Sequence, residues 1–349
     1  MVSSVKDAAW LKWMAQLMGQ PARPQRSGVS TPSEQYYCLL DEQPTHLVPE
    51  RLLATRHSEK LSTQDLYVNP ECEFSRNGEL PAWATDSRSD DNNFARNGTI
   101  AWVRDAATGT TLPFWLEEDL SNLLEGLQAG EAAPRDFPED ARSALKTAEI
   151  LIEENHAVKR QRQWAEAVSQ CGPRFRQNGY VPIGRLLHPY QVGALRRYYR
   201  CLIRKGKLRL GDEHNPRRYV AKNEPVASFF HHQLKPVVTE IAGRAVKPSY
   251  VYVASYLSGS KLEKHTDREP CEFTINLLLD YSPEPVRESP WPLRLQSGQT
   301  NITVYQAIGD VLLYRGCELA HYRDTLPERN TSTSIFFHYV REEYSGTLT

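Results

Sequence analysis

The sequence predicts an α+β protein whose C-terminal half is a double-stranded β-helix, a double-sheet jelly roll, with flanking helices. From Ser249 onward, short runs rich in Val, Ile, Leu and Tyr alternate with turn residues at close spacing, a pattern typical of antiparallel double sheets. Strands are expected over 250–256, 271–280, 310–314 and 332–340, and a hairpin is expected from strands over 293–296 and 302–305. Before Ser249, helical periodicity and proline-initiated helices dominate, and turn-rich segments precede them. A length of 349 residues is enough for two domains. We therefore expect a mixed accessory region over 1–170 and the jelly roll over 171–349.

Composition limits the classes of function. A formal net charge of −1 does not fit a strongly basic protein, so wholesale nucleic-acid binding is not implied. The six cysteines are scattered and form no Cys-x-x-Cys pair, which favours a reduced protein over a disulfide framework or a zinc site. No stretch is apolar for long enough to span a bilayer. We expect a cytoplasmic protein without a membrane partner.

The accessory region begins with an amphipathic helix over 1–20 instead of a signal peptide, because lysines interrupt the apolar positions. A Pro-, Arg- and Ser-rich linker follows over 21–32. Phe74–Gly78 and Phe94–Gly98 repeat the pattern Phe-x-Arg-Asn-Gly, and Asn-Gly favours tight hairpin turns. We favour two successive hairpins over a duplicated contact surface, with a polar loop over 86–93 between them.

Helices are predicted over 113–128, 138–148 and 155–169, with a short strand over 150–152. This order outlines a winged-helix-like unit that could bind a peptide or nucleic acid. A helical spacer that covers the catalytic half fits the same pattern. The segment Cys171-Gly-Pro173 is the expected boundary between the two regions.

Two further helices are expected in the second half. One begins at Pro189, because proline suits the first helical position, and its basic stripe (Arg196, Arg197, Arg200, Arg204 and Lys205) is typical of a solvated face. The other runs over 225–243 with a kink at Pro236. It contains His231 and His232, which point about 100° apart on a helix and are interpreted as packing residues.

The residues that carry chemistry are His265, Asp267 and His321. His265 and Asp267 are two apart, so on an extended segment their side chains point to the same side. Two imidazoles and one carboxylate are the facial triad of non-haem Fe(II) sites, which leaves further coordination positions open. His321 follows the strand expected over 310–314, and the intervening strands of a jelly roll would return the chain to the first two ligands.

The His-x-Asp motif after a strand, the run Gly309–Tyr314 before His321, and Arg329 before a terminal strand together resemble the Fe(II)- and 2-oxoglutarate-dependent dioxygenases. The resemblance is closest to the prolyl-hydroxylase-like branch and covers roughly residues 176–349. It implies that His265, Asp267 and His321 bind Fe(II), and that 2-oxoglutarate and O₂ are co-substrates. Ascorbate is a candidate stimulant of the reaction.

The resemblance also implies a co-substrate pocket. A basic residue near the start of the last strand would hold the distal carboxylate of 2-oxoglutarate, since a guanidinium pairs bidentately with a carboxylate. Arg329 is the preferred residue and Arg323 is the rival. Tyr256 matches the Tyr that this branch places before the His-x-Asp motif. Thr274 and Asn276 share one face of an apolar strand, where either a bound carboxylate or a neighbouring strand would satisfy them.

Three functions remain. The first is 2-oxoglutarate-dependent hydroxylation of an unactivated C–H, with an amino-acid side chain of a peptide or a free amino acid as the expected substrate. The second is a metal-retaining binding or sensor module without turnover. The third is oxidative demethylation of nucleic acid, which the near-neutral charge disfavours. The sequence leaves the oligomeric state open.

Overall fold

The computed structural model describes residues 35–40, 47–49, 52, 65–76, 81, 98–184 and 186–348 of the chain. The predicted helix over 1–20, the linker over 21–32 and the loop over 86–93 lie outside the described residues. Most of the two Asn-Gly turns also lies outside them. All the residues predicted for the metal site and its pocket lie inside them.

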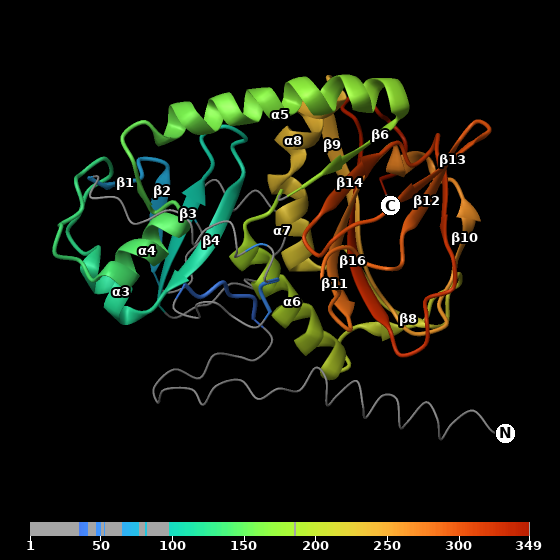
Figure 1. Ribbon diagram of the computed structural model, residues 1–349, viewed down its shortest axis with the longest axis horizontal. Coiled ribbons are helices and arrows are strands. Elements are labelled where there is room, and N and C mark those ends of the chain that lie inside the picture. The colour runs from blue at the N-terminus through green and yellow to red at the C-terminus, as the bar shows by residue number, and fades with distance from the viewer. Residues whose placement is uncertain are drawn as a thin grey trace.

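The C-terminal half contains a seven-stranded sheet in which all neighbouring strands are antiparallel (Figure 1). In spatial order its strands are β6 (Tyr180–Ile183), β14 (Val311–Tyr314), β11 (Phe273–Ser282), β16 (Thr331–Arg341), β9 (Val246–Tyr256), β8 (Arg218–Lys222) and β7 (Arg209–Leu210). The predicted strands over 250–256, 271–280, 310–314 and 332–340 are all found here. Their β-branched and aromatic residues suit a pleated, buried surface.

A second antiparallel sheet has four strands and faces the first. In spatial order they are β10 (Leu262–His265), β15 (Ala320–Arg323), β12 (Leu293–Ser297) and β13 (Thr300–Val304). Leu293 and Leu295 of β12 share a buried apolar cluster with Leu312 and Tyr314 of β14. A 3₁₀ turn, η2 (Glu269–Cys271), leads from β10 towards β11. The chain is thus a mixed α and β protein with antiparallel sheets, as predicted.

Helices cover the other face of the seven-stranded sheet (Figure 1). They are α5 (His156–Asn178), α6 (Pro189–Arg204), α7 (Pro225–Gln233) and α8 (Lys235–Ala242). Ile275 and Leu277 of β11 join the core cluster that these helices build. Since side chains alternate along a strand, Thr274 and Asn276 point towards the second sheet. Within the described ranges, no helix combines the length and the apolar character needed to cross a membrane.

The helix predicted over 225–243 is interrupted near Pro236, as expected. α7 ends at Gln233 and α8 begins at Lys235, because proline lacks an N–H and its ring clashes with the preceding turn. Gly243 ends α8 with φ 71°, a conformation that suits glycine. His231 is buried and contacts the carbonyl oxygen of His338 through Nε2 at 2.7 Å, which agrees with a packing role.

The prediction that the basic stripe of α6 is a solvated face is wrong for its first member, Arg196, whereas Arg204 and Lys205 are exposed. Arg196 is 1% exposed, and its Nε donates to Asp280 Oδ1 at 3.0 Å. Arg200 donates to Asp280 Oδ2 at 2.6 Å. Although burial opposes ionisation, these two guanidinium groups lower the pKa of Asp280 to about 2. Arg196 and Arg200 therefore attach α6 to the end of β11.

The first half of the chain forms smaller elements. A three-stranded sheet contains β2 (Cys72–Arg76), β3 (Thr99–Arg104) and β4 (Thr111–Leu116), and a two-stranded sheet contains β1 (Tyr67–Val68) and β5 (Leu151–Ile152). The helices are α3 (Glu118–Leu123) and α4 (Glu139–Thr147). The helix predicted over 113–128 is wrong in its first part, since all six residues of β4 pair with β3. Leu112, Trp115 and Leu116 fit a helical spacing as well as a strand, and pairing with β3 decides the outcome.

The predicted boundary at Cys171-Gly-Pro173 is not a break in secondary structure. α5 continues through Pro173 to Asn178 and ends at Gly179, which has φ 77°. Phe175 is fully buried and lies 6.1 Å from the ring of Phe273. This packing outweighs the local helix-breaking tendency. The division of the chain into two domains stays a prediction.

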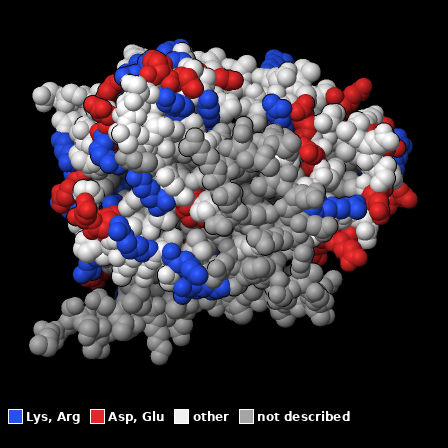
Figure 2. All heavy atoms as spheres, turned by 180° about the vertical axis from the view of Figure 1, so that it is seen from behind, with Lys and Arg blue, Asp and Glu red and all other residues white. Residues whose placement is uncertain are grey.

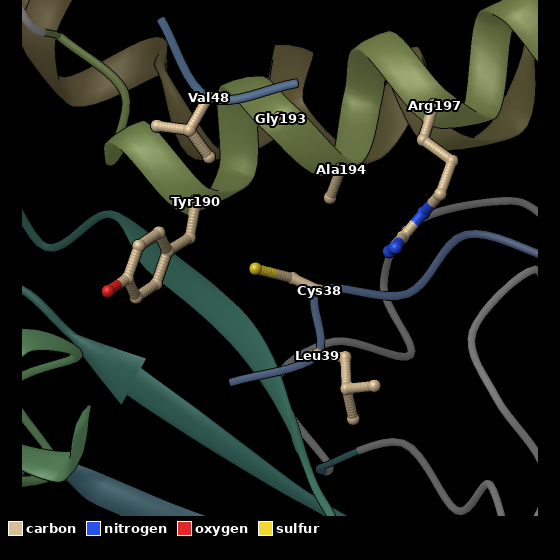
Figure 3. Close-up of a pocket in the computed structure, with 7 residues that line it drawn as sticks. All are labelled: Cys38, Leu39, Val48, Tyr190, Gly193, Ala194 and Arg197. Carbon is tan, nitrogen blue, oxygen red and sulfur yellow. The ribbon is translucent and has the colours of Figure 1, made fainter. Parts of the chain in front are cut away.

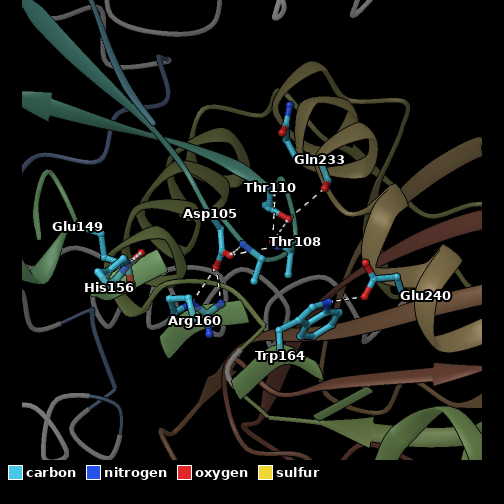
Figure 4. Close-up of polar contacts among 10 residues, drawn as sticks. Asp105, Thr108, Thr110, Glu149, His156, Arg160, Trp164, Gln233 and Glu240 are labelled. Atoms are coloured by element: carbon cyan, nitrogen blue, oxygen red, sulfur yellow. Dashed lines mark hydrogen bonds and ion pairs between the residues drawn. The ribbon is translucent and has the colours of Figure 1, made fainter. Parts of the chain in front are cut away.

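The two halves share contacts along α5 and α7 (Figure 4). The turn after β3 is held from both sides: Asp105 accepts from Arg160 Nε at 3.2 Å, and Thr110 Oγ1 donates to the Gln233 carbonyl at 3.2 Å. Buried residues of the three-stranded sheet, of α6–α8 and of β11 belong to one continuous apolar cluster. The first half is therefore packed against the second through a common core.

Candidate metal centre

The site is built on two strands of the four-stranded sheet. β10 and β15 pair antiparallel with His265 directly opposite His321, so the two imidazole rings lie on one face with centroids 4.4 Å apart. Asp267 follows His265 by two residues. Its Oδ1 lies 3.7 Å from His265 Nε2 and 3.5 Å from His321 Nε2. One ligand atom from each residue lies within 4.8 Å of the other two, which is compatible with a single metal ion. The structure thus brings together all three predicted ligands.

Backbone contacts orient both imidazoles. His265 Nδ1 is 2.7 Å from the Glu263 carbonyl, and His321 Nδ1 is 3.0 Å from the Leu319 carbonyl. A carbonyl oxygen only accepts, so Nδ1 carries the proton in each ring. Nε2 then presents its lone pair to the metal position, the arrangement that metal-binding histidines need. His321 is buried, whereas the side chain of His265 is 41% exposed, so the site opens on the His265 side.

Asp267 is held at both its backbone and its carboxylate. Its N–H donates to the Gly316 carbonyl at 2.9 Å, and Oδ2 accepts from Thr274 Oγ1 at 3.2 Å. Burial opposes ionisation, but the neighbouring imidazoles, His321 foremost, hold the pKa of Asp267 below its ordinary value. Gly316 has no room for a side chain, because a Cβ there would meet the Asp267 carboxylate and lie 2.6 Å from the Cys271 carbonyl.

A buried histidine supports Asp267 from behind. His338 of β16 is 6% exposed, and its Nδ1 lies 3.0 Å from Thr274 Oγ1. The Thr274 hydroxyl donates its one proton to Asp267, so in the contact between His338 and Thr274 the donor is His338 Nδ1. Burial lowers the pKa of His338 to about 4, so it is neutral near pH 7. The sequence placed His338 on the last strand but could not tell which way it faces.

Asp267, Cys271 and His338 form a second set of neighbouring potential ligands. The Sγ atom of Cys271 is 3.0 Å from the Tyr250 hydroxyl, and burial raises the pKa of this thiol to about 12. A metal binds the thiolate, not the thiol. The His265, Asp267 and His321 set is therefore the better metal site.

Arg323 lies deeper in the same interior. It is two residues beyond His321, on the same face of β15, and is 2% exposed. Its Nη1 donates to the Trp291 carbonyl, and its guanidinium lies 4.7 Å from the Trp291 ring centroid. Nη2 has no hydrogen-bond partner, and no carboxylate of the described ranges forms an ion pair with Arg323. Burial lowers the pKa of Arg323 to about 10, so it remains charged at neutral pH.

Other polar atoms in this interior also lack partners. Asn276 lies two residues beyond Thr274 on β11, and neither the nitrogen nor the oxygen of its amide is hydrogen-bonded. Ser332 faces Tyr256 across the β16–β9 pairing, and its Oγ is likewise unpartnered. The Tyr256 hydroxyl accepts from Arg218 at 3.2 Å. Buried polar groups are normally hydrogen-bonded, so these atoms mark a place for a polar ligand.

Arg329 is not brought into this interior. It is exposed and sits in the turn before β16 with φ 63°. The predicted pocket residues Tyr256, Thr274, Asn276 and Arg323 are buried between the sheets. Sequence reasoning missed Ser332 and Gly316. Ser332 could have been found from its place at the start of the last predicted strand, whereas nothing local marks Gly316.

A separate hollow lies beside α6 (Figure 3). Its lining consists of Cys38, Leu39, Val48, Tyr190, Gly193, Ala194 and Arg197. None of these residues belongs to the two sheets that hold the triad, so this hollow is not part of the metal centre.

No protein-family model and no curated protein matches the sequence. Among solved structures, a prolyl-4-hydroxylase from Pseudomonas putida is similar, with a TM-score of 0.42, 13% identity, and coverage of 50% of this chain and 99% of that one. A 2-oxoglutarate-Fe(II) oxygenase family protein from Burkholderia pseudomallei has a TM-score of 0.41, 14% identity, and coverage of 52% and 92%. A prolyl hydroxylase from Trichoplax adhaerens, bound to a hypoxia inducible factor peptide, has a TM-score of 0.42, 12% identity, and coverage of 50% and 89%. Each of these similarities covers about half of this chain.

Proposed function

We propose that this protein is an Fe(II)- and 2-oxoglutarate-dependent oxygenase. One juxtaposition carries the proposal: a three-ligand metal site and an uncompensated buried guanidinium lie on the same face of β15, at His321 and Arg323. Two residues along a strand span roughly 7 Å, about the reach of a five-carbon dicarboxylate that chelates a metal at one end. His265, Asp267 and His321 would hold Fe(II), and Arg323 would hold the distal carboxylate of 2-oxoglutarate.

The charge of Arg323 supports an anionic ligand. Burying an unpaired ion costs several kcal/mol, and this guanidinium has a free Nη2 and only a backbone carbonyl at Nη1. A carboxylate would offset that cost and accept from Nη2. Asn276 and Ser332 supply further polar atoms beside it. In this proposal Arg323 binds the distal carboxylate of 2-oxoglutarate, a role for which the sequence favoured Arg329.

When bound, Fe(II) with 2-oxoglutarate and O₂ would supply the oxidising power to hydroxylate an unactivated C–H, with succinate and CO₂ as the other products. The residues of the chain prepare the site for this. Thr274 fixes the Asp267 carboxylate, and the backbone carbonyls fix both imidazoles. Tyr256, Tyr314 and Trp291 are buried around the deep end and exclude water from it.

The fold is consistent with the same proposal. We infer that the two facing antiparallel sheets form a double-stranded β-helix, with the triad between them. Residues 171–349 would be the catalytic part and residues 1–170 an accessory part. The expected substrate is an amino-acid side chain, either in a peptide or in a free amino acid.

Of the two alternatives, nucleic-acid demethylation has little support. Basic and acidic side chains are interspersed over the described part of the face in Figure 2, and the net charge is −1. Binding of nucleic acid would instead favour a basic surface and would weaken steeply with salt. A sensor without turnover would keep the metal but produce no succinate.

The test is 2-oxoglutarate turnover by purified protein with Fe(II), ascorbate and O₂. Oxygenases of this kind convert some 2-oxoglutarate without a second substrate, so we expect slow succinate formation that chelation of the metal abolishes. Succinate is measured by chromatography. Iron bound in a one-to-one ratio, without any succinate, would favour the sensor. A salt-sensitive complex with DNA or RNA would favour the demethylase.

A further inference from the structure

Two cations contact one aromatic ring, that of Tyr250, near the metal centre. Tyr250 of β9 is 8% exposed, and its ring lies 4.5 Å from that of His338. The Arg268 guanidinium lies 5.6 Å from the centroid of the Tyr250 ring and donates to its hydroxyl at 3.2 Å. Lys222 Nζ lies 4.8 Å from the same centroid. Two positive charges therefore lie on the ring of Tyr250, which packs against His338, the histidine that supports Asp267.

Both cations are linked to the metal site through neighbouring residues. Arg268 directly follows the ligand Asp267, and Lys222 ends β8 opposite Tyr252. Both also act electrostatically on the buried His338, where they oppose its protonation and so lower its pKa. The inner face of β9 runs from Tyr250 here to Tyr256 at the deep end near Arg323. The cation pair and Arg323 thus lie at opposite ends of one interior.

No acidic side chain in the described part of the chain forms an ion pair with either cation. Asp267, directly before Arg268, acts on it electrostatically without forming an ion pair. Two nearby glutamates are engaged elsewhere: Glu272 pairs with Arg244 and Arg341, and Glu269 hydrogen-bonds to Tyr344. Two like charges on one ring repel each other, and the cation–π contacts offset only part of that cost. An oxyanion bound by both cations would offset the repulsion and would accept charge-assisted hydrogen bonds.

We propose that Arg268 and Lys222, arranged around Tyr250, bind a carboxylate of the primary substrate and thereby select an acidic substrate. This inference rests on the proposed oxygenase function and names the substrate class of the same site. The carboxylate could belong to an acidic side chain of a peptide or to the terminus of a free acid. In either case it would anchor the substrate within reach of the metal, while 2-oxoglutarate occupies the deep end at Arg323.

Paramagnetic broadening of probe resonances tests this selectivity without relying on turnover. The protein is loaded with Mn(II) and saturated with 2-oxoglutarate, and the proton line widths of matched probes are measured. One pair is N-acetyl-glutamate and N-acetyl-glutamine, both as N-methylamides, which differ in a side-chain carboxylate. The other pair is N-acetyl-alanine and its amide, which differ in a terminal carboxylate. The pair that shows the difference identifies the source of the carboxylate.

We expect the acid of at least one pair to be broadened about fivefold more than its amide, as a charge-assisted contact near the metal predicts. Lys222→Gln and Arg268→Gln should each reduce that ratio to about twofold or less. Lys222 is exposed, so its substitution tests the proposal even if the Arg268 variant folds poorly. Lys235→Gln, on α8 and paired with Glu342, is the matched control and should keep the full ratio.

Equal broadening of acid and amide in both pairs would overturn the proposal. A ratio that survives both substitutions would overturn it too, because the acid would then bind elsewhere, for example at Arg323. Succinate formation from 2-oxoglutarate is measured in parallel on the iron-loaded native protein. Absence of acid selectivity in the native protein, with succinate formed, refutes only the cation pair, whereas absence of succinate refutes the proposed function itself.

Discussion

At the scale of single residues, the site depends on hydrogen bonds that leave particular atoms free. Each imidazole donates a hydrogen bond from Nδ1 to a carbonyl two residues earlier in the chain. Thr274 donates a hydrogen bond to Oδ2 of Asp267. The atoms left over are two Nε2 lone pairs and Oδ1, which converge. The sequence predicted these three ligands because their residue types and the spacing of two on a strand are local properties.

The arginine proposed to bind 2-oxoglutarate shows what local sequence cannot decide. Arg323 and Arg329 are both close to His321 in the sequence, and only the geometry separates them: Arg323 is 2% exposed beside the site, whereas Arg329 is exposed in a turn. Strand alternation correctly placed Arg323 on the face of His321. Its burial depends on Trp291 and Tyr256, which come from other strands and cannot be placed beside Arg323 from local sequence.

Arg323→Gln should weaken 2-oxoglutarate binding by about 10- to 100-fold, since a hydrogen bond to a charged group contributes about 1.5–3 kcal/mol. Metal content should not change, because Arg323 does not contact the ligands. Equilibrium dialysis of 2-oxoglutarate with the Mn(II)-loaded protein measures the effect. Arg329→Gln is the matched control and should bind within about twofold of the native protein. The reverse pattern would return the role to Arg329.

At the scale of elements, the strands were predicted better than the contacts between them. Alternation and turn residues located the hairpin of β12 and β13, and the proline rule located the break between α7 and α8. The strand β4 was mistaken for a helix because its apolar residues fit both periods, and the pairing with β3 that decides the matter is formed with residues 99–104. The basic stripe of α6 was mistaken for a solvated face because its partner Asp280 lies about eighty residues later.

Asp280→Asn should lower the free energy of unfolding by about 3–5 kcal/mol at pH 7, because it leaves Arg196 buried without its main counter-charge. The pKa of Asp280 in the folded protein is about 2, below the unfolded value of 3.8. Its stabilising contribution is therefore present above about pH 4 and is lost as the pH falls towards 2. The difference between native and variant should shrink over that range.

Urea unfolding at a series of pH values measures this difference. Asp324→Asn is the matched control, since Asp324 pairs with Arg294 at the surface with 60% of its side chain exposed. That change should alter stability by less than about 1 kcal/mol. If Asp280→Asn were as mild as the control, α6 would not depend on the buried ion cluster.

At the scale of the whole molecule, the chain is a pair of facing antiparallel sheets with helices on one side. The smaller elements of the first half of the chain pack against these helices. The sequence predicted the mixed class and the antiparallel sheets, because hydrophobic periodicity is a local signal. It could not predict that α5 runs through Pro173, or that the apolar residues of the three-stranded sheet and of α6–α8 form one cluster. These features arise from long-range packing.

The shared core has a consequence for the accessory region. Phe229 of α7 lies 6.1 Å from the ring of Trp102 in β3, and Gln191 of α6 donates to the Pro113 carbonyl at 2.6 Å. Removing residues 1–170 would expose these faces to water. The first half of the chain therefore supports the helical layer of the second half.

The central claim is that one metal ion and 2-oxoglutarate bind together at the triad. Anaerobic equilibrium dialysis measures Fe(II) and 2-oxoglutarate on the native protein and on Asp267→Ala, with Asp324→Ala as the control. We predict one Fe(II) per native chain, 2-oxoglutarate bound tightly only when the metal is present, and at least about 100-fold weaker metal binding in Asp267→Ala, because one of three ligands is removed. Unchanged iron content in Asp267→Ala, or tight 2-oxoglutarate binding without metal, would contradict the account.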